Sequence, residues 1–241
     1  MKNRAFRLLQ GLGMASASLA LVAPAWAADP FTDAMQAAYA PYRAALFRTN
    51  SGDVQASRQA VEQASQAWAQ VARQFTTAPP PYDRDPAFSR SLAEVAAVYD
   101  KAAAEVQAGQ LAAAHDSLEA VRDILSKLRE RNQVVVYSDH MNAYHEVMEH
   151  VLGLDPATLE QPEGRMAAMA QTGALEHLAH QLQEKAPYQL RDQAGFKELL
   201  DGVQQSVAQL KNALLRQDAN AARAALGKLK APYSKLFLKF G

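Results

Sequence analysis

The 241-residue sequence contains no cysteine. This absence excludes disulfides, thiolate metal sites, cysteine-ligated iron–sulfur clusters and the CxxCH attachment of haem. Any bound metal ion would therefore have to be held by His, Met, Asp or Glu side chains.

The sequence also lacks an excess of charge of either sign, with 25 Lys and Arg against 25 Asp and Glu. Without the three basic residues among residues 1–27, the balance is 22 against 25. Such a balance provides no electrostatic footprint for nucleic acid or an anionic lipid surface. We therefore expect neither as a partner.

Long apolar runs are missing after residue 27, where nothing approaches the roughly 18 apolar residues of a membrane span. Residues 1–27 themselves have the pattern of a secretory signal peptide. Three basic residues precede an apolar run from Gly11 to Val22, and Ala25-Trp26-Ala27 gives a small-x-small cleavage site. We expect cleavage after Ala27 and a soluble, exported, periplasmic protein of 214 residues with no membrane insertion.

The remaining chain is rich in Ala, Gln, Leu, Arg and Glu, which are good helix formers. Apolar residues recur at helical spacings, as Val54, Val61, Trp68 and Val71 do. The pattern predicts an all-α fold of antiparallel helical hairpins that form a bundle of about eight helices. The expected hairpins are residues 31–76, 86–132, 137–185 and 191–238.

We expect one helical domain over residues 28–241, because the single hairpin before the proline-rich stretch 79–83 would not be stable alone. Two four-helix units are the alternative. The β-branched run from Val134 to Val136 is expected to interrupt the chain between the second and third hairpins.

The third hairpin, 137–185, differs in composition from the others. Five of the six histidines and four of the five methionines after residue 27 lie between residues 140 and 180. Imidazole with thioether, in the absence of thiolate, suits copper and especially Cu(I). Carboxylates nearby leave zinc, nickel, cobalt and iron open. The clustering therefore predicts a transition-metal ion as cofactor.

Helical periodicity divides these residues between two facing walls, as in metal sites inside helical bundles. Met141, Met166 and Met169 are expected beside the site as further soft groups. His115 stands alone in the sequence, and His150 points away from the site together with Asp139 and Glu146, so neither histidine is expected to be a ligand. The predicted metal ligands are His145, Met148, Glu149, Glu176, His177 and His180.

The His145-x-x-Met148 spacing resembles, over four residues, the His/Met segments of periplasmic copper- and silver-binding proteins. It implies transport, buffering or sensing of a metal ion. A helical adaptor without metal, docking a periplasmic or membrane protein partner, is the alternative. A b-type haem or di-metal redox protein is a third possibility. The sequence contains no GxSxG, P-loop or HExxH motif, so no catalytic residue is predicted.

Overall fold

The computed structural model describes residues 29–241 and confirms the all-α fold of antiparallel hairpins. The signal peptide predicted over residues 1–27 lies outside the described residues. Between residues 29 and 241 there is no strand. The helices are α1 (Pro30–Thr49), α2 (Val54–Gln74), α3 (Phe88–Gln107), α4 (Leu111–Arg131), α5 (Tyr137–Leu152), α6 (Pro162–Glu184), α7 (Tyr188–Arg191), α8 (Ala194–Leu215), α9 (Ala219–Leu226) and α10 (Lys230–Phe240), with short 3-10 turns at Tyr82–Arg84 and Pro156–Glu160.

Local sequence signals set several of these boundaries. The Asp53 carboxylate accepts a hydrogen bond from the first turn of α2, and Asp218 does the same for α9. Gly52 and Gly109 adopt φ angles of 81° and 74° in the turns before α2 and α4, a region that glycine enters without steric cost. One helix was expected where α9 and α10 lie. The helix is interrupted at residues 227–229, and Pro232 in the first turn of α10 has no N–H to donate to the carbonyl of residue 228.

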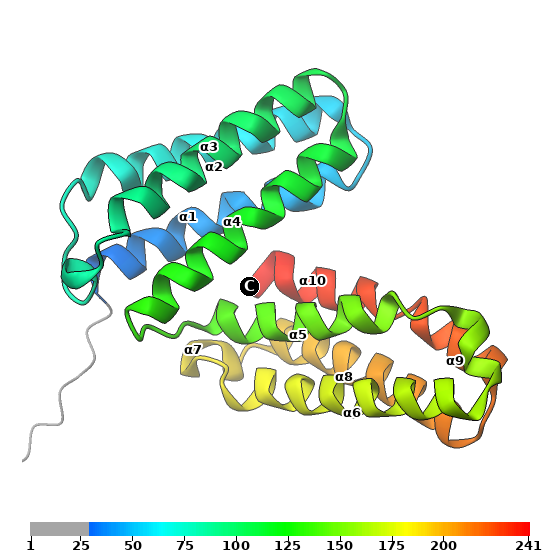
Figure 1. The fold of residues 1–241 in the computed structure, drawn as a ribbon. Coiled ribbons are helices and arrows are strands. Elements are labelled where there is room, and N and C mark those ends of the chain that lie inside the picture. The colour runs from blue at the N-terminus through cyan, green and yellow to red at the C-terminus, as the bar shows by residue number, and fades with distance from the viewer. Residues whose placement is uncertain (1–28) are drawn as a thin grey trace, which may run out of the picture.

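The helices form two four-helix arrangements that lie against each other (Figure 1). Helices α1 to α4 form the first bundle. Helices α5, α6 and α8 form the second bundle with the broken helix α9–α10 as its fourth member. The buried apolar residues of both bundles form one cluster. The single-domain assignment stays a prediction.

The bundles are joined by one chain connection and by the packing of α10 on α1. The chain leaves α4 through Gln133, whose φ angle is 57°, and the non-helical residues Val134 to Val136, which confirms the predicted interruption. At the other side of the interface α10 packs on α1. There the ring centroids of Tyr39 and Phe237 are 6.3 Å apart, edge to face.

Candidate functional site

The three predicted metal ligands on α5 lie in two environments. Met148 is fully buried in the apolar core. At the edge of the same helix, His145 Nε2 is 3.5 Å from Glu149 Oε1, and Lys230 Nζ of α10 is 3.1 Å from that oxygen. The imidazole of His145 also packs on the ring of Tyr233, with 5.5 Å between centroids. This side of α5 thus faces α10.

The three predicted ligands on α6 face elsewhere. Glu176 Oε2 is 2.5 Å from Lys211 Nζ of α8. His177 is exposed, and its Nε2 lies 3.0 Å from the side-chain amide of Gln181 on the same helix. His180 is exposed as well. The carboxylate is therefore directed to α8 and both imidazoles to solvent.

The methionines of the two helices also differ in burial. Met141 and Met148 are fully buried, Met169 is half-buried, and Met166 is 67 % exposed. Within residues 29–241 no three or more His, Asp or Glu side chains are grouped so that they could hold a metal ion. The six-residue metal site stays a prediction. The structure brings His145 and Glu149 together on α5 and places Glu176 and His180 along one groove beside α8, and these two pairs lie on different faces.

A pocket of about 320 Å³ lies where the two bundles meet, and we call it the inter-bundle pocket. Its walls come from α1 and α4 of the first bundle and from α5 and α10 of the second. The polar side chains used below are Arg43, His115, Glu119, Arg122, His145 and Lys230.

The wall supplied by α4 is a stripe of polar residues on one helical face. His115, Glu119, Arg122, Ser126 and Arg129 follow one another at spacings of three or four residues, which places them on the same side of the helix. This periodicity is visible in the sequence. It would have indicated a polar face on α4, but not that the second bundle covers it.

His115, which is isolated in the sequence, has a histidine near it in space. It lines the same pocket as His145, although the two are 30 residues apart on different hairpins. Its Nδ1 is 3.1 Å from the Leu46 carbonyl oxygen and 3.3 Å from Thr49 Oγ1, so α1 fixes the ring. His150, by contrast, is exposed as expected.

His145 is held in the neutral form. Burial lowers its pKa to about 3, and the positive charges of Arg122 and Lys230 and the neighbouring His115 act in the same direction. Only 12 % of the side chain is exposed. An uncharged imidazole, able to donate and to accept one hydrogen bond, therefore lines the pocket at neutral pH.

Among the cations of the inter-bundle pocket, Arg122 has no carboxylate within hydrogen-bond distance. Its side chain is only 11 % exposed, yet its nearest carboxylates are Glu119 at 3.6 Å and Asp123 at 3.9 Å. Both distances exceed a hydrogen bond. The pKa of Arg122 is raised because, although burial alone would lower it, the nearby Tyr42 and Glu119 outweigh burial. The guanidinium therefore stays charged with unused donors.

The other two cations of the pocket are occupied. Arg43 Nε is 3.3 Å from the Leu238 carbonyl oxygen, and its Nη1 donates to the backbone oxygen of Gly241. Lys230 is paired with Glu149. Three cations, Arg43, Arg122 and Lys230, stand against the carboxylates of Glu119 and Glu149, so one net positive charge remains in and beside the pocket.

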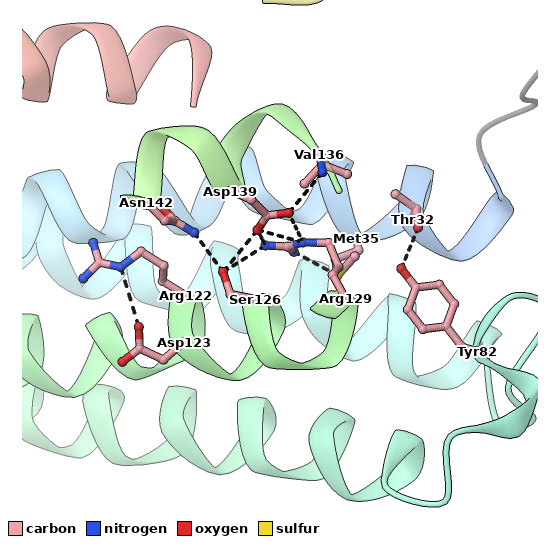
Figure 2. A network of polar contacts seen from close by, with 10 residues as sticks. All are labelled: Thr32, Met35, Tyr82, Arg122, Asp123, Ser126, Arg129, Val136, Asp139 and Asn142. Atoms are coloured by element: carbon pink, nitrogen blue, oxygen red, sulfur yellow. Dashed lines mark hydrogen bonds and ion pairs between the residues drawn. The ribbon is translucent and has the colours of Figure 1, made fainter. Parts of the chain in front are cut away.

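A network of polar contacts joins α4 of the first bundle to α5 of the second (Figure 2). The fully buried Arg129 of α4 donates from Nε to Asp139 Oδ2 of α5 at 3.0 Å, and its Nη2 pairs with the same carboxylate. Asp139 also accepts from Val136 N at 3.0 Å, and Ser126 links it to Asn142. The expectation that Asp139 belongs to an outward, solvated face is wrong, because α4 covers it.

An open groove of about 830 Å³ continues from the pocket between α4 and α5, and we call it the acidic groove. Glu119, Asp123, Glu130, Glu146 and Glu149 are among its lining residues. The cationic pocket and this acidic groove share Glu119, Arg122 and His145. The interface between the bundles is thus polarised from one end to the other.

Buried tyrosines form the layer beneath His145. The rings of Tyr144 and Tyr233 stack with 5.2 Å between centroids, and the Tyr233 hydroxyl donates to the Met141 carbonyl oxygen at 3.1 Å. Burial raises the pKa of both phenols, so both remain neutral. This packing holds α10 against α5 and keeps that wall of the pocket rigid.

None of the helices between residues 29 and 241 combines the length and apolar character that a membrane crossing requires. No family model, curated protein or solved structure matches the chain. The functional assignment therefore depends on the site itself.

Proposed function

We propose that this protein is an exported, periplasmic helical binding protein that holds a small molecule in the inter-bundle pocket. Export is supported by the signal-peptide pattern of residues 1–27. One observation carries the binding proposal. A pocket of about 320 Å³ at the junction of two bundles contains a nearly buried Arg122 whose guanidinium has no acceptor within hydrogen-bond distance.

Such a side chain can bind an acceptor from a ligand. Its nitrogens are not among the fully buried unpartnered atoms, so they keep some contact with solvent, and a ligand oxygen that replaces this water in a partly desolvated site makes a stronger, charge-assisted hydrogen bond. Sites of this kind, concave and mostly apolar with a few convergent polar groups, are typical of small-molecule binding. The apolar share of the wall comes from Leu46, Phe47, Phe237 and Leu238.

The experiment compares two tryptophan variants on α10. Ser234 lines the pocket, whereas its neighbour Lys235 is exposed on the outer face of the helix. A mixture of small organic acids, amides, amines and alcohols is added to each purified protein, and saturation-transfer NMR identifies the compounds that bind. We expect binding to the unaltered protein and to Lys235→Trp, and its loss in Ser234→Trp. Equal binding in both variants, or no binding at all, would contradict the proposal.

Transition-metal binding is the second candidate, for transport, buffering or sensing. It is favoured by the pairing of His145 with Glu149 and by the neutral state of that imidazole, since a metal binds only the unprotonated ring. The cations Arg122 and Lys230 beside the pair oppose it. Copper remains the first choice by ligand type, with zinc, nickel or iron after it.

Titration with Cu(I), Cu(II), Zn(II) and Ni(II) tests this candidate. The protein is compared with a His145→Ala, His177→Ala, His180→Ala triple variant and, as a control, with a His150→Ala variant. Metal-binding function predicts submicromolar affinity that the triple variant loses and the control keeps. Affinity weaker than micromolar for all four ions removes this candidate.

A further inference from the structure

We propose that the inter-bundle pocket selects a monocarboxylate with a compact apolar body, whose carboxylate is bound by Arg122 with the histidines His115 and His145 beside it. This inference rests on the proposed small-molecule function and names its ligand class. It follows from the charge, the polarity gradient and the size of the pocket.

The charge of the pocket fits one negative charge. Arg43 donates to two backbone oxygens and Lys230 pairs with Glu149, whereas Arg122 has only Glu119, at 3.6 Å, and keeps donors without a partner at hydrogen-bond distance. A planar carboxylate can accept two parallel hydrogen bonds from a guanidinium, which a single-point anion cannot. A metal or organic cation would instead meet Arg122 and Lys230 at close range.

A second negative charge would find no free partner. An inorganic phosphate dianion would have to displace Glu149 from Lys230 or the backbone oxygens from Arg43. His145 lies in the same pocket with 12 % of its side chain exposed, and its imidazole can donate a hydrogen bond that supplements those of Arg122.

The apolar side chains define where the rest of the ligand lies. Phe47 of α1 is 47 % exposed, an unusual state for a large aromatic residue, and it lines the pocket opening together with Leu238. Arg122 and His145 are much less exposed and lie at the end that the pocket shares with the acidic groove. The ligand carboxylate is therefore placed at this end and the apolar body against Phe47.

The volume sets the size of that body. A pocket of about 320 Å³ has room for about ten water-sized groups, at roughly 30 Å³ for each water in the liquid. Phenylacetate, a single ring with one short acid arm, is compact enough for such a pocket, and phenylacetamide has the same shape without the charge. The two compounds therefore separate recognition of the carboxylate from recognition of the apolar body.

Isothermal titration calorimetry of the purified, unaltered protein at pH 7 compares phenylacetate, phenylacetamide and inorganic phosphate. We expect phenylacetate to bind at least tenfold more tightly than either of the others. Arg122→Gln should weaken phenylacetate at least tenfold and leave phenylacetamide unchanged. Lys127→Gln, an exposed change on the same helix and outside the pocket, should alter neither.

The outcomes distinguish the ligand class from the function. If phenylacetamide binds as tightly as phenylacetate, the apolar shape alone is recognised and the carboxylate proposal is wrong. If phosphate binds best, the site takes an anion without an apolar body, and the proposal is wrong as well. Both comparisons use the unaltered protein, so they hold even if Arg122→Gln fails to fold. If no member of the broader mixture binds in the pocket, the proposed function itself fails.

Discussion

The inner side of α5 and the outer face of α6 belong to one His/Met-rich hairpin, yet the fold uses them differently. His145 of α5 is covered by α4 and α10 and contacts charged and aromatic side chains from both bundles. His177 and His180 of α6 are exposed, and His177 contacts a glutamine on its own helix. Proximity in sequence therefore did not produce proximity in space. A site arose where a second bundle covers a polar helical face.

The largest expected difference between the two regions concerns their ion pairs. Asp139→Ala leaves the fully buried Arg129 without its partner, and such a change typically costs about 3–5 kcal/mol of unfolding free energy. Glu176→Ala removes the pair with Lys211, in which both side chains are about one-third exposed, and should cost about 1 kcal/mol or less. Urea unfolding of both variants measures the contrast. Similar losses would show that the bundles are not locked by Arg129.

The methionines sharpen the comparison in the core. Met148 is fully buried, so Met148→Ala leaves a cavity and should lower the unfolding free energy by about 2–5 kcal/mol. Met166 on α6 is largely exposed, and Met166→Ala should change stability by about 0.5 kcal/mol at most. Thermal unfolding monitored by circular dichroism measures the stability of both variants. A strong effect of Met166→Ala would mean that the α6 face is covered by a partner or a second copy.

The histidines give an effect that is absent at pH 7 and grows as the pH falls. Between about pH 6.5 and pH 3 the unfolded chain binds a proton at residue 145 that the folded protein does not, so acid favours unfolding. Because the folded pKa is lowered, His145 costs about 1.4 kcal/mol of stability for each pH unit below 6.5. His145→Gln should remove this part of the slope.

His177→Gln is the matched control, because His177 is exposed. It should leave the dependence of unfolding free energy on pH as it is in the unaltered protein. Urea unfolding at several pH values between 4 and 7 measures both variants. An unchanged slope in His145→Gln would mean that the imidazole is not buried in the uncharged form.

The fold was predictable from the sequence because helical periodicity and capping residues act locally. Asp53 and Asp218 begin α2 and α9 by contacts within their own first turns. The same periodicity correctly placed His145 beside Glu149 on one side of α5. It did not reveal which helix that side would face.

The inter-bundle pocket could not be predicted in this way, because it depends on how the bundles dock. His115 and His145 lie on different hairpins, and Asp139 looks like a solvent-facing residue until α4 covers it. The burial of Arg129 is likewise a property of the docked pair of bundles. Only the polar stripe on α4, which contains His115, Arg122 and Arg129, was present in the sequence as a signal.

The central claim is that small molecules bind between the bundles and not on the α6 face. The most direct measurement is NMR of the histidine ring signals, assigned by single substitutions, during titration with phenylacetate or with the tightest binder from the compound mixture. The account predicts that the signals of His115 and His145 shift in a saturable manner while those of His177 and His180 stay in place. Shifts confined to His177 and His180 would contradict it.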